Sequence, residues 1–304
     1  MTGALTPRAV ERLRPRIAAV VEDLLAELDR KDDPDLVRDF AYPLPITVIA
    51  DLLGVPAADR AALKVWSDEL AVLVGSALDE GDKYDRAARG LGEMAGYFRG
   101  LLADRRAGPR DDLLTALAQA GPPGGSATDD ELVATSVLLL FAGHETTTNL
   151  LGNGLVALLD HPEARAAWRA DPGLTGSAVE ELLRFDGPSG AMTRVVREPL
   201  TLSGRALQPG DRVFLMIQAA NRDPRQFPDP DRLDLGRVEN RHLAFGHGLH
   251  FCVGAPLARL EAQLAFPALL ARLDRAEAAL DRLEWLDSLV FRGVRALPVR
   301  LRRP

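Results

Sequence analysis

The hydrophobic pattern of the chain is helical over most of its first half. Apolar residues recur every three or four positions over residues 7–28, and the same spacing returns over 47–53, 58–78, 84–103 and 113–117. Such spacing places apolar side chains on one face of an α-helix. A segment rich in Gly and Pro, residues 121–126, predicts a loop after these helices.

A longer helix is predicted in the middle of the chain. Thr128 and Glu131 have the spacing of a capping box, in which each side chain accepts from the other residue's backbone N–H. The apolar pattern then continues to about Leu159, which corresponds to about 30 residues and about 45 Å of helix. Residues 143–148 interrupt it with polar side chains, and buried polar groups need partners or a function.

The second half mixes shorter helices with strands. Helical patterns cover 162–168 and 178–185, strand patterns cover 200–202 and 212–217, and residues 221–234 form an aperiodic meander rich in Pro and Asp. A helix is expected from the loop around Cys252 to about Leu273, bent at Pro267, and alternation over 283–301 suggests terminal strands. The predicted fold class is mainly α with minor β.

Composition narrows the class of protein. The chain has 304 residues, 47% of them hydrophobic and 27% charged, which is ordinary for a globular domain. A net charge of -7 disfavours a nucleic-acid partner. The single cysteine excludes an intramolecular disulfide and a cysteine cluster. Without a signal peptide or an apolar run long enough to span a membrane, we expect one domain over residues 1–304 in the cytoplasm.

The context of that cysteine is unusual. Residues 245–254 read FGHGLHFCVG, and the glycines allow the backbone to approach a flat ligand closely. Cys252 lies just before a predicted helix, whose N–H groups favour a thiolate. Phe245 can pack on a macrocycle, and His250 can reach one of its carboxylates. The loop suits an axial haem ligand, although a lone cysteine is more often a small buried hydrophobic residue.

Residues 245–261 resemble the cysteine-ligand loop and following helix of bacterial cytochrome P-450, a family of haem-thiolate monooxygenases. The resemblance implies a cytochrome P-450 fold, with a long central helix over the haem and small β-sheets. It implies haem b (iron protoporphyrin IX) as cofactor, with Cys252 as the axial ligand of the iron. Phe245, Gly246 and Gly254 would also bind the cofactor, and His250 would pair with a propionate.

The middle of the long helix resembles the oxygen-activation motif of the same family, with Ala142 and Gly143 at the cofactor. Gly143 would leave room over the iron. The Thr146 hydroxyl would bond back to the Ala142 carbonyl and donate to oxygen, while Glu145 relays protons. The alternative is a buried polar helix with local back-bonding. A zinc protease is excluded, because the second histidine it needs is replaced by Thr148.

Two further resemblances concern arginines. Glu181 and Arg184 match a structural ion network of the family, and Arg232 is predicted to supply its third member. Taken alone, Glu181 and Arg184 also fit a weak surface ion pair. Arg194 matches the arginine that pairs with a haem propionate, although an ordinary arginine at a strand edge would look the same.

The implied activity is that of an oxidoreductase. A haem-dependent monooxygenase would insert one oxygen atom of O2 into a small lipophilic substrate, using electrons from a ferredoxin and its NAD(P)H-dependent reductase. Arg259 would belong to a basic patch that receives this partner. Residues 139–143, 188–192 and 288–290 would line the substrate space.

The resemblance starts with a segment, residues 6–10, that normally lies well inside these proteins. We therefore expect a cytochrome P-450 domain that is incomplete at the N-terminus, with haem propionates left to Arg194 and His250. The alternative function is that of a truncated, catalytically impaired relative, acting as a non-catalytic partner or representing a gene fragment.

Overall fold

The computed structural model describes residues 5–75, 81–119 and 127–302. The loop expected over 121–126 and the end of the helix expected over 58–78 lie outside these residues. The described helices follow the order α1 (Pro7–Glu11), α2 (Arg14–Leu28), α3 (Pro43–Leu53), α4 (Arg60–Gly75), α5 (Lys83–Ala107), α6 (Leu113–Gln119), α7 (Asp129–Asp160), α8 (Pro162–Ala170), α9 (Thr175–Asp186), α10 (Ile217–Asn221) and α11 (Ala255–Leu273). The mainly helical class is confirmed.

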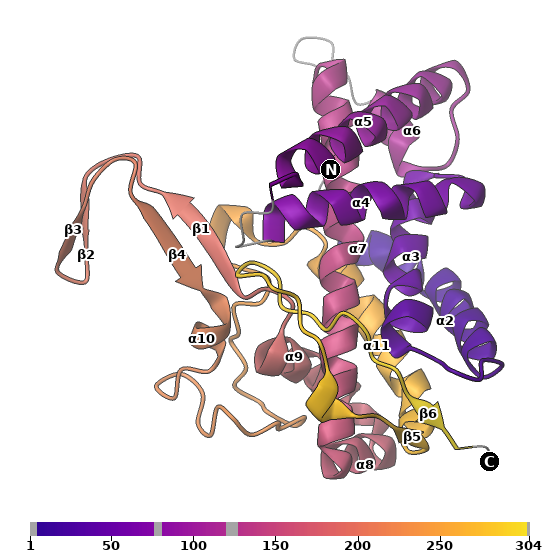
Figure 1. Ribbon diagram of the computed structural model, residues 1–304, viewed down its shortest axis with the longest axis vertical. Helices are drawn as coiled ribbons and strands as arrows, with labels where there is room; N and C mark the ends of the chain where they lie inside the picture. Colours follow the sequence, from indigo (N-terminus) through magenta and orange to yellow (C-terminus); the bar gives the residue numbers. More distant parts are fainter. Residues whose placement is uncertain (1–4, 76–80, 120–126, 303–304) are drawn as a thin grey trace.

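Helix α7 runs through the middle of the molecule (Figure 1). Its start is the predicted capping box: Glu131 N–H donates to Thr128 Oγ1 at 3.3 Å, and Thr128 N–H donates to the Glu131 carboxylate at 2.6 Å. The helix ends at Asp160, because Pro162 opens α8 two residues later. No helix in the described part of the chain is long and apolar enough to cross a membrane.

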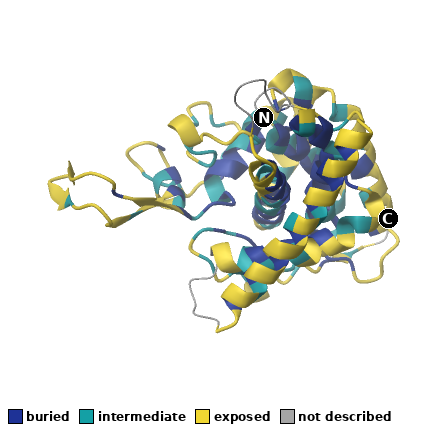
Figure 2. Ribbon diagram, turned by 90° about the horizontal axis from the view of Figure 1, so that it is seen from above, coloured by how far each residue is buried: buried dark blue, intermediate teal, exposed yellow. Residues whose placement is uncertain are grey.

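Helices α3, α5, α9 and α11 pack against α7 (Figure 1). Glycine in α7 permits the closest of these approaches: a Cβ added at Gly154 would lie 2.4 Å from the ring of Phe266 in α11. Figure 2 shows the buried residues gathered around α7 and the exposed ones on the outer helices. The core is therefore built on the central helix.

In the part of the chain that the structure describes, the strands form three antiparallel pairs: β1 (Ala191–Val195) with β4 (Arg212–Met216), β2 (Leu200–Leu202) with β3 (Arg205–Leu207), and β5 (Ala276–Glu277) with β6 (Arg300–Leu301). The β1–β4 ribbon, in which Ala191 faces Met216, leads to the β2–β3 hairpin at the tip of a projection from the helices (Figure 1). Most of its residues are exposed (Figure 2). Strand β1 and helix α10 were not predicted.

Two predicted elements differ in the structure. The helix expected over 7–28 is divided into α1 and α2, because Pro15 has no N–H to donate to the carbonyl four residues earlier. The prediction of terminal strands over 283–301 is mostly wrong, because only β6 is a strand there. The rest of the segment forms isolated β-bridges, such as the one between Trp285 and Val294, because it pairs briefly with several different parts of the chain. Helix α11 does continue through Pro267.

The contact at Gly154 generates a stability prediction. Gly154→Ala should lower the free energy of unfolding by about 1–3 kcal/mol, because the buried Phe266 ring has to move. Gly100→Ala in α5 is the control: its added Cβ meets nothing within 4 Å, so helix propensity should raise stability by up to about 1 kcal/mol. Denaturant unfolding of the three proteins measures both changes, and equal effects would refute the packing argument.

Candidate active site

Cys252 lies at the end of a tightly folded loop. Gly246 and Gly248 have φ of 72° and 75°, a left-handed conformation that glycine adopts without strain. The turn this allows brings the Cys252 N–H to the Phe245 carbonyl at 2.9 Å. Helix α11 starts three residues later at Ala255, with Gly254 at its N-cap. The sequence thus places one thiol directly before a helix N-terminus, as predicted.

The thiol and its neighbours are exposed rather than buried. Leu249 is 96% exposed, Phe251 51% and Val253 41%, although all three are large apolar residues. Exposed apolar groups gathered in one loop mark a binding surface. A thiol among apolar side chains is also the donor set of a haem-thiolate site, so the loop fits that cofactor. The structure argues against the simple alternative of a buried structural cysteine.

Without a bound cation, the surroundings of the Cys252 sulfur favour its protonated form. Burial by neighbouring atoms raises the pKa of the Cys252 thiol, whereas the N–H groups of Gly254 and Ala255 and the charge of Arg259 oppose that rise. The helix N-terminus therefore favours the thiolate, as predicted, but does not by itself lower the pKa. A coordinated metal ion would complete the deprotonation.

One face of α7 supplies the second predicted group of residues. Leu138, Ala142 and Thr146 follow each other at four-residue spacing, and the first two are exposed. Thr146 Oγ1 donates to the Ala142 carbonyl at 3.3 Å, the back-bond expected from the sequence. Leu138, 60% exposed, was not singled out, although its spacing to Ala142 and Thr146 was the available signal.

Gly143 has a packing role that the sequence analysis does not predict. A Cβ at this position would lie 2.7 Å from Ile49 Cγ1, so the missing side chain permits the approach of α3 to α7. Leu139 and Leu140, expected to line the substrate space, are buried in the hydrophobic core.

Glu145 is partly buried beside a buried histidine. Burial, followed by the negative charge of Asp68, raises the pKa of Glu145. The neighbouring His144 is completely buried, and its Nδ1 lies 2.8 Å from the Leu140 carbonyl. Burial lowers the pKa of His144 to about 4, so it is neutral at physiological pH. A carboxyl group with a raised pKa suits proton transfer near neutral pH.

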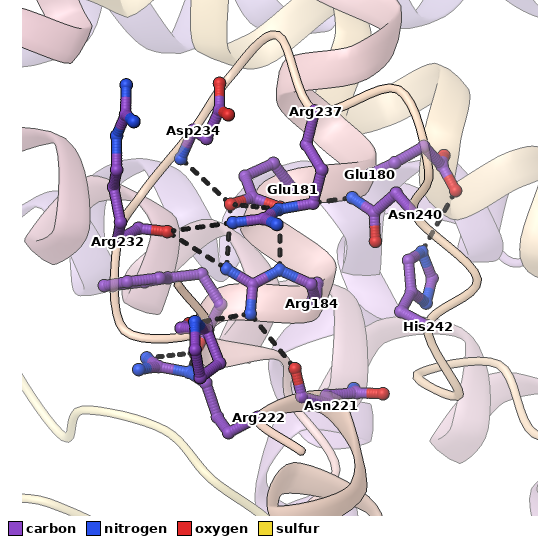
Figure 3. Close-up of polar contacts among 12 residues, drawn as sticks. Glu180, Glu181, Arg184, Asn221, Arg222, Arg232, Asp234, Arg237, Asn240 and His242 are labelled. Atoms are coloured by element: carbon purple, nitrogen blue, oxygen red, sulfur yellow. Dashed lines mark hydrogen bonds and ion pairs between the residues drawn. The ribbon is translucent and has the colours of Figure 1, made fainter. Parts of the chain in front are cut away.

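The ion network around Glu181 is buried (Figure 3). Arg184 donates to both Glu181 carboxylate oxygens at 2.8 Å, and neither side chain is exposed. The predicted third member is wrong: Arg237, not Arg232, places its guanidinium Nε 3.1 Å from Glu181. Arg232 contributes its backbone carbonyl, which accepts from Arg184 at 3.2 Å. Its own side chain is exposed because the meander turns it outward.

The remaining predicted residues lie on the surface. His250 is exposed in the turn before Cys252, and Arg194 is exposed on β1, where it donates to the Thr193 carbonyl at 2.9 Å. The segments 188–192 and 288–290 do come together, since Gly190 N–H donates to the Val290 carbonyl at 2.9 Å. Arg259 does not form a free basic patch, because Glu180 pairs with it at 2.6 Å.

The identity of the third arginine can be tested. Arg237→Ala should lower the free energy of unfolding by about 3–5 kcal/mol, because it leaves the buried Glu181 charge undercompensated. Arg232→Ala should change it by less than about 0.5 kcal/mol, since its side chain is exposed. Denaturant titrations compare the two variants, and a larger loss for Arg232→Ala would reverse the assignment.

Known proteins similar to this chain belong to one family. The sequence profile of the family described as "Cytochrome P450" matches residues 99–172 and 173–283. The cytochrome P450 monooxygenase PikC of Streptomyces venezuelae is 45% identical over 306 residues, covering 98% of this chain and 71% of PikC. The vitamin D(3) 25-hydroxylase of Pseudonocardia autotrophica is 43% identical over 304 residues, covering 98% and 73%.

Solved structures of the same family are also similar to this chain. The structure of CYP109E1 from Bacillus megaterium in complex with testosterone superposes with a TM-score of 0.92 at 36% identity, covering 99% of this chain and 79% of that one. Relatives named as monooxygenases do not favour the alternative of a non-catalytic protein. The chain belongs to the cytochrome P450 family of haem-thiolate monooxygenases.

Proposed function

We propose that this protein uses haem b to insert one oxygen atom of O2 into a small lipophilic substrate. The second oxygen atom leaves as water, which takes two electrons and two protons, and a ferredoxin with its NAD(P)H-dependent reductase supplies the electrons. The observation that carries the proposal is the exposed Cys252 thiol among exposed apolar side chains at the start of α11.

Several of the described residues would bind haem together. Cys252 would ligate the iron, and Phe245, Gly246, Gly254, Ala142 and Gly143 would surround the macrocycle. Arg194 and His250 both have exposed side chains that can reach outward to the propionates. When bound, a thiolate-ligated haem supplies the redox chemistry that cleaves the O–O bond.

Glu145 and Thr146 would deliver the protons. Thr146 Oγ1 is held by its bond to the Ala142 carbonyl, so the hydroxyl stays on the open face of α7. Glu145 directly precedes Thr146 in the sequence, and its pKa is raised because burial removes it from water. A carboxyl group with a raised pKa takes up and passes on a proton more readily near neutral pH.

Exposed apolar side chains support a lipophilic substrate. Leu138 on α7, Met192 on β1 and Leu289 in the C-terminal segment are exposed apolar residues from three elements. Gly190 ties the last two segments together through its bond to Val290. One relative is named as a vitamin D(3) 25-hydroxylase and another was solved in complex with testosterone, and both molecules are lipophilic, as expected for the substrate.

Haem binding through Cys252 is the direct test. The protein should take up hemin, and its reduced carbon monoxide complex should show the red-shifted Soret band of thiolate ligation. Cys252→Ser should lose that band, while Gly100→Ala, a change with no neighbour within 4 Å, should keep it. Absence of hemin uptake by the unmodified protein, or the same band in Cys252→Ser, would overturn the proposal.

The proton role of Thr146 is tested by its coupling of electrons to product. With Thr146→Ala, the rate of product formation should fall about 100-fold, as for loss of a positioned proton donor, while NAD(P)H is still consumed and hydrogen peroxide appears. Ser136→Ala is the matched control, because Ser136 makes the same back-bond to Leu132, at 2.8 Å, on a buried face of α7. Unchanged coupling in Thr146→Ala would refute this role.

A further inference from the structure

A polar cluster joins three elements next to the cysteine loop. Arg259 in α11 donates to both oxygens of Glu180 in α9, at 2.6 and 2.8 Å. His242, in the segment that leads to Cys252, places Nε2 3.0 Å from the same carboxylate (Figure 3). Glu180 is therefore the one group in this cluster that binds both the helix after the cysteine and the loop before it.

The hydrogen bonds of His242 fix which ring nitrogen carries a proton. Ala244 N–H donates to Nδ1 at 3.2 Å, so Nδ1 is the acceptor and Nε2–H donates to Glu180. Only 3% of the His242 side chain is exposed. The loop that runs to Cys252 is thus anchored at its beginning by a buried contact to Glu180.

Arg259 extends the cluster to the cysteine itself. Its guanidinium stacks over the Phe245 ring at 4.4 Å, and the Phe245 carbonyl accepts from the Cys252 N–H at 2.9 Å. Arg259 therefore packs on the residue whose carbonyl fixes the Cys252 backbone, and it brings the positive charge of this cluster to the cysteine loop.

Glu180 balances that charge. Although burial opposes its ionisation, the bonds from Arg259 and His242 lower the pKa of Glu180 to about 2, so it is negative at neutral pH. The pair then adds little net charge to the surroundings of the cysteine loop, whereas either partner alone would add a full one. A change of one charge near a metal centre shifts its reduction potential.

We propose that Glu180 is a positioning residue for the thiolate ligand: through His242 and Arg259 it fixes the cysteine loop, and by neutralising Arg259 it sets the reduction potential of the bound iron. This inference rests on the proposed haem-thiolate function. Its electrostatic part predicts shifts of the reduction potential in opposite directions for changes at Glu180 and at Arg259, which a purely structural contact would not produce.

Potentiometric titration of the haem-loaded protein tests the electrostatic part. Glu180→Gln removes a negative charge and should raise the potential, making the iron about tenfold more reduced at the wild-type midpoint, or about 59 mV. Arg259→Gln should shift it in the opposite direction, and the double variant should return near wild type. Asp29→Asn is the matched control, since Asp29 pairs with Arg272 at 2.6 Å at the far end of the same helix.

Hydrogen exchange of the haem-free protein tests the positioning part. Glu180→Gln should increase exchange at the amides of Ala244 and Cys252, and Asp29→Asn should not. The inference would be overturned if Glu180→Gln and Arg259→Gln shifted the reduction potential in the same direction, or by no more than Asp29→Asn does. If Glu180→Gln does not fold, Arg259→Gln alone still decides the sign. Failure of the unmodified protein to bind haem would instead refute the proposed function.

Discussion

The buried carboxylate of Glu181 is the constraint on which the C-terminal half depends. A charge removed from water needs several partners, and Glu181 finds them in Arg184, Arg237, the Asp234 N–H and Asn240. The last three of these partners lie at residues 234–240, at and just beyond the end of the meander, where no helix or strand holds the chain. This stretch therefore takes its path from the bonds that Glu181 requires.

The same constraint reaches the cysteine loop. Arg184 also bonds the Asn221 carbonyl at 3.0 Å, and the buried Asn221 side chain accepts from the Leu243 N–H at 2.7 Å. Leu243 follows His242, which is bound to Glu180, the neighbour of Glu181 on α9. One turn of α9 thus organises both the meander and the loop that carries Cys252, on its two sides.

Helix α7 combines a packing role with a chemical one on different faces. Its glycines meet α3 and α11 closely, whereas Ala142 and Thr146 remain on an open side. Ser136 and Thr146 make the same back-bond, but only Thr146 stays accessible. The chemical role of this helix therefore depends on one of its faces not being covered by the neighbouring helices.

Periodic and locally capped elements could be predicted from the sequence. The capping box of Thr128 and the turn before Cys252 are decided by residues a few positions apart, and both were correct. The choice between Arg232 and Arg237 could not be made, because an aperiodic segment offers no face, and tertiary contacts select the residue that points inward. The packing of Gly143 against Ile49 could not be predicted for the same reason: Ile49 is distant in the sequence.

The β1–β4 ribbon has a consequence for handling the protein. Among the described residues β1 pairs only with β4, so no strand covers its other edge, and Val195 and Phe214 add exposed apolar surface. An open edge of this kind is a template for strands of other molecules. Self-association of concentrated samples should therefore start at this projection, and crystals or aggregates should show intermolecular sheets there before the helical body is affected.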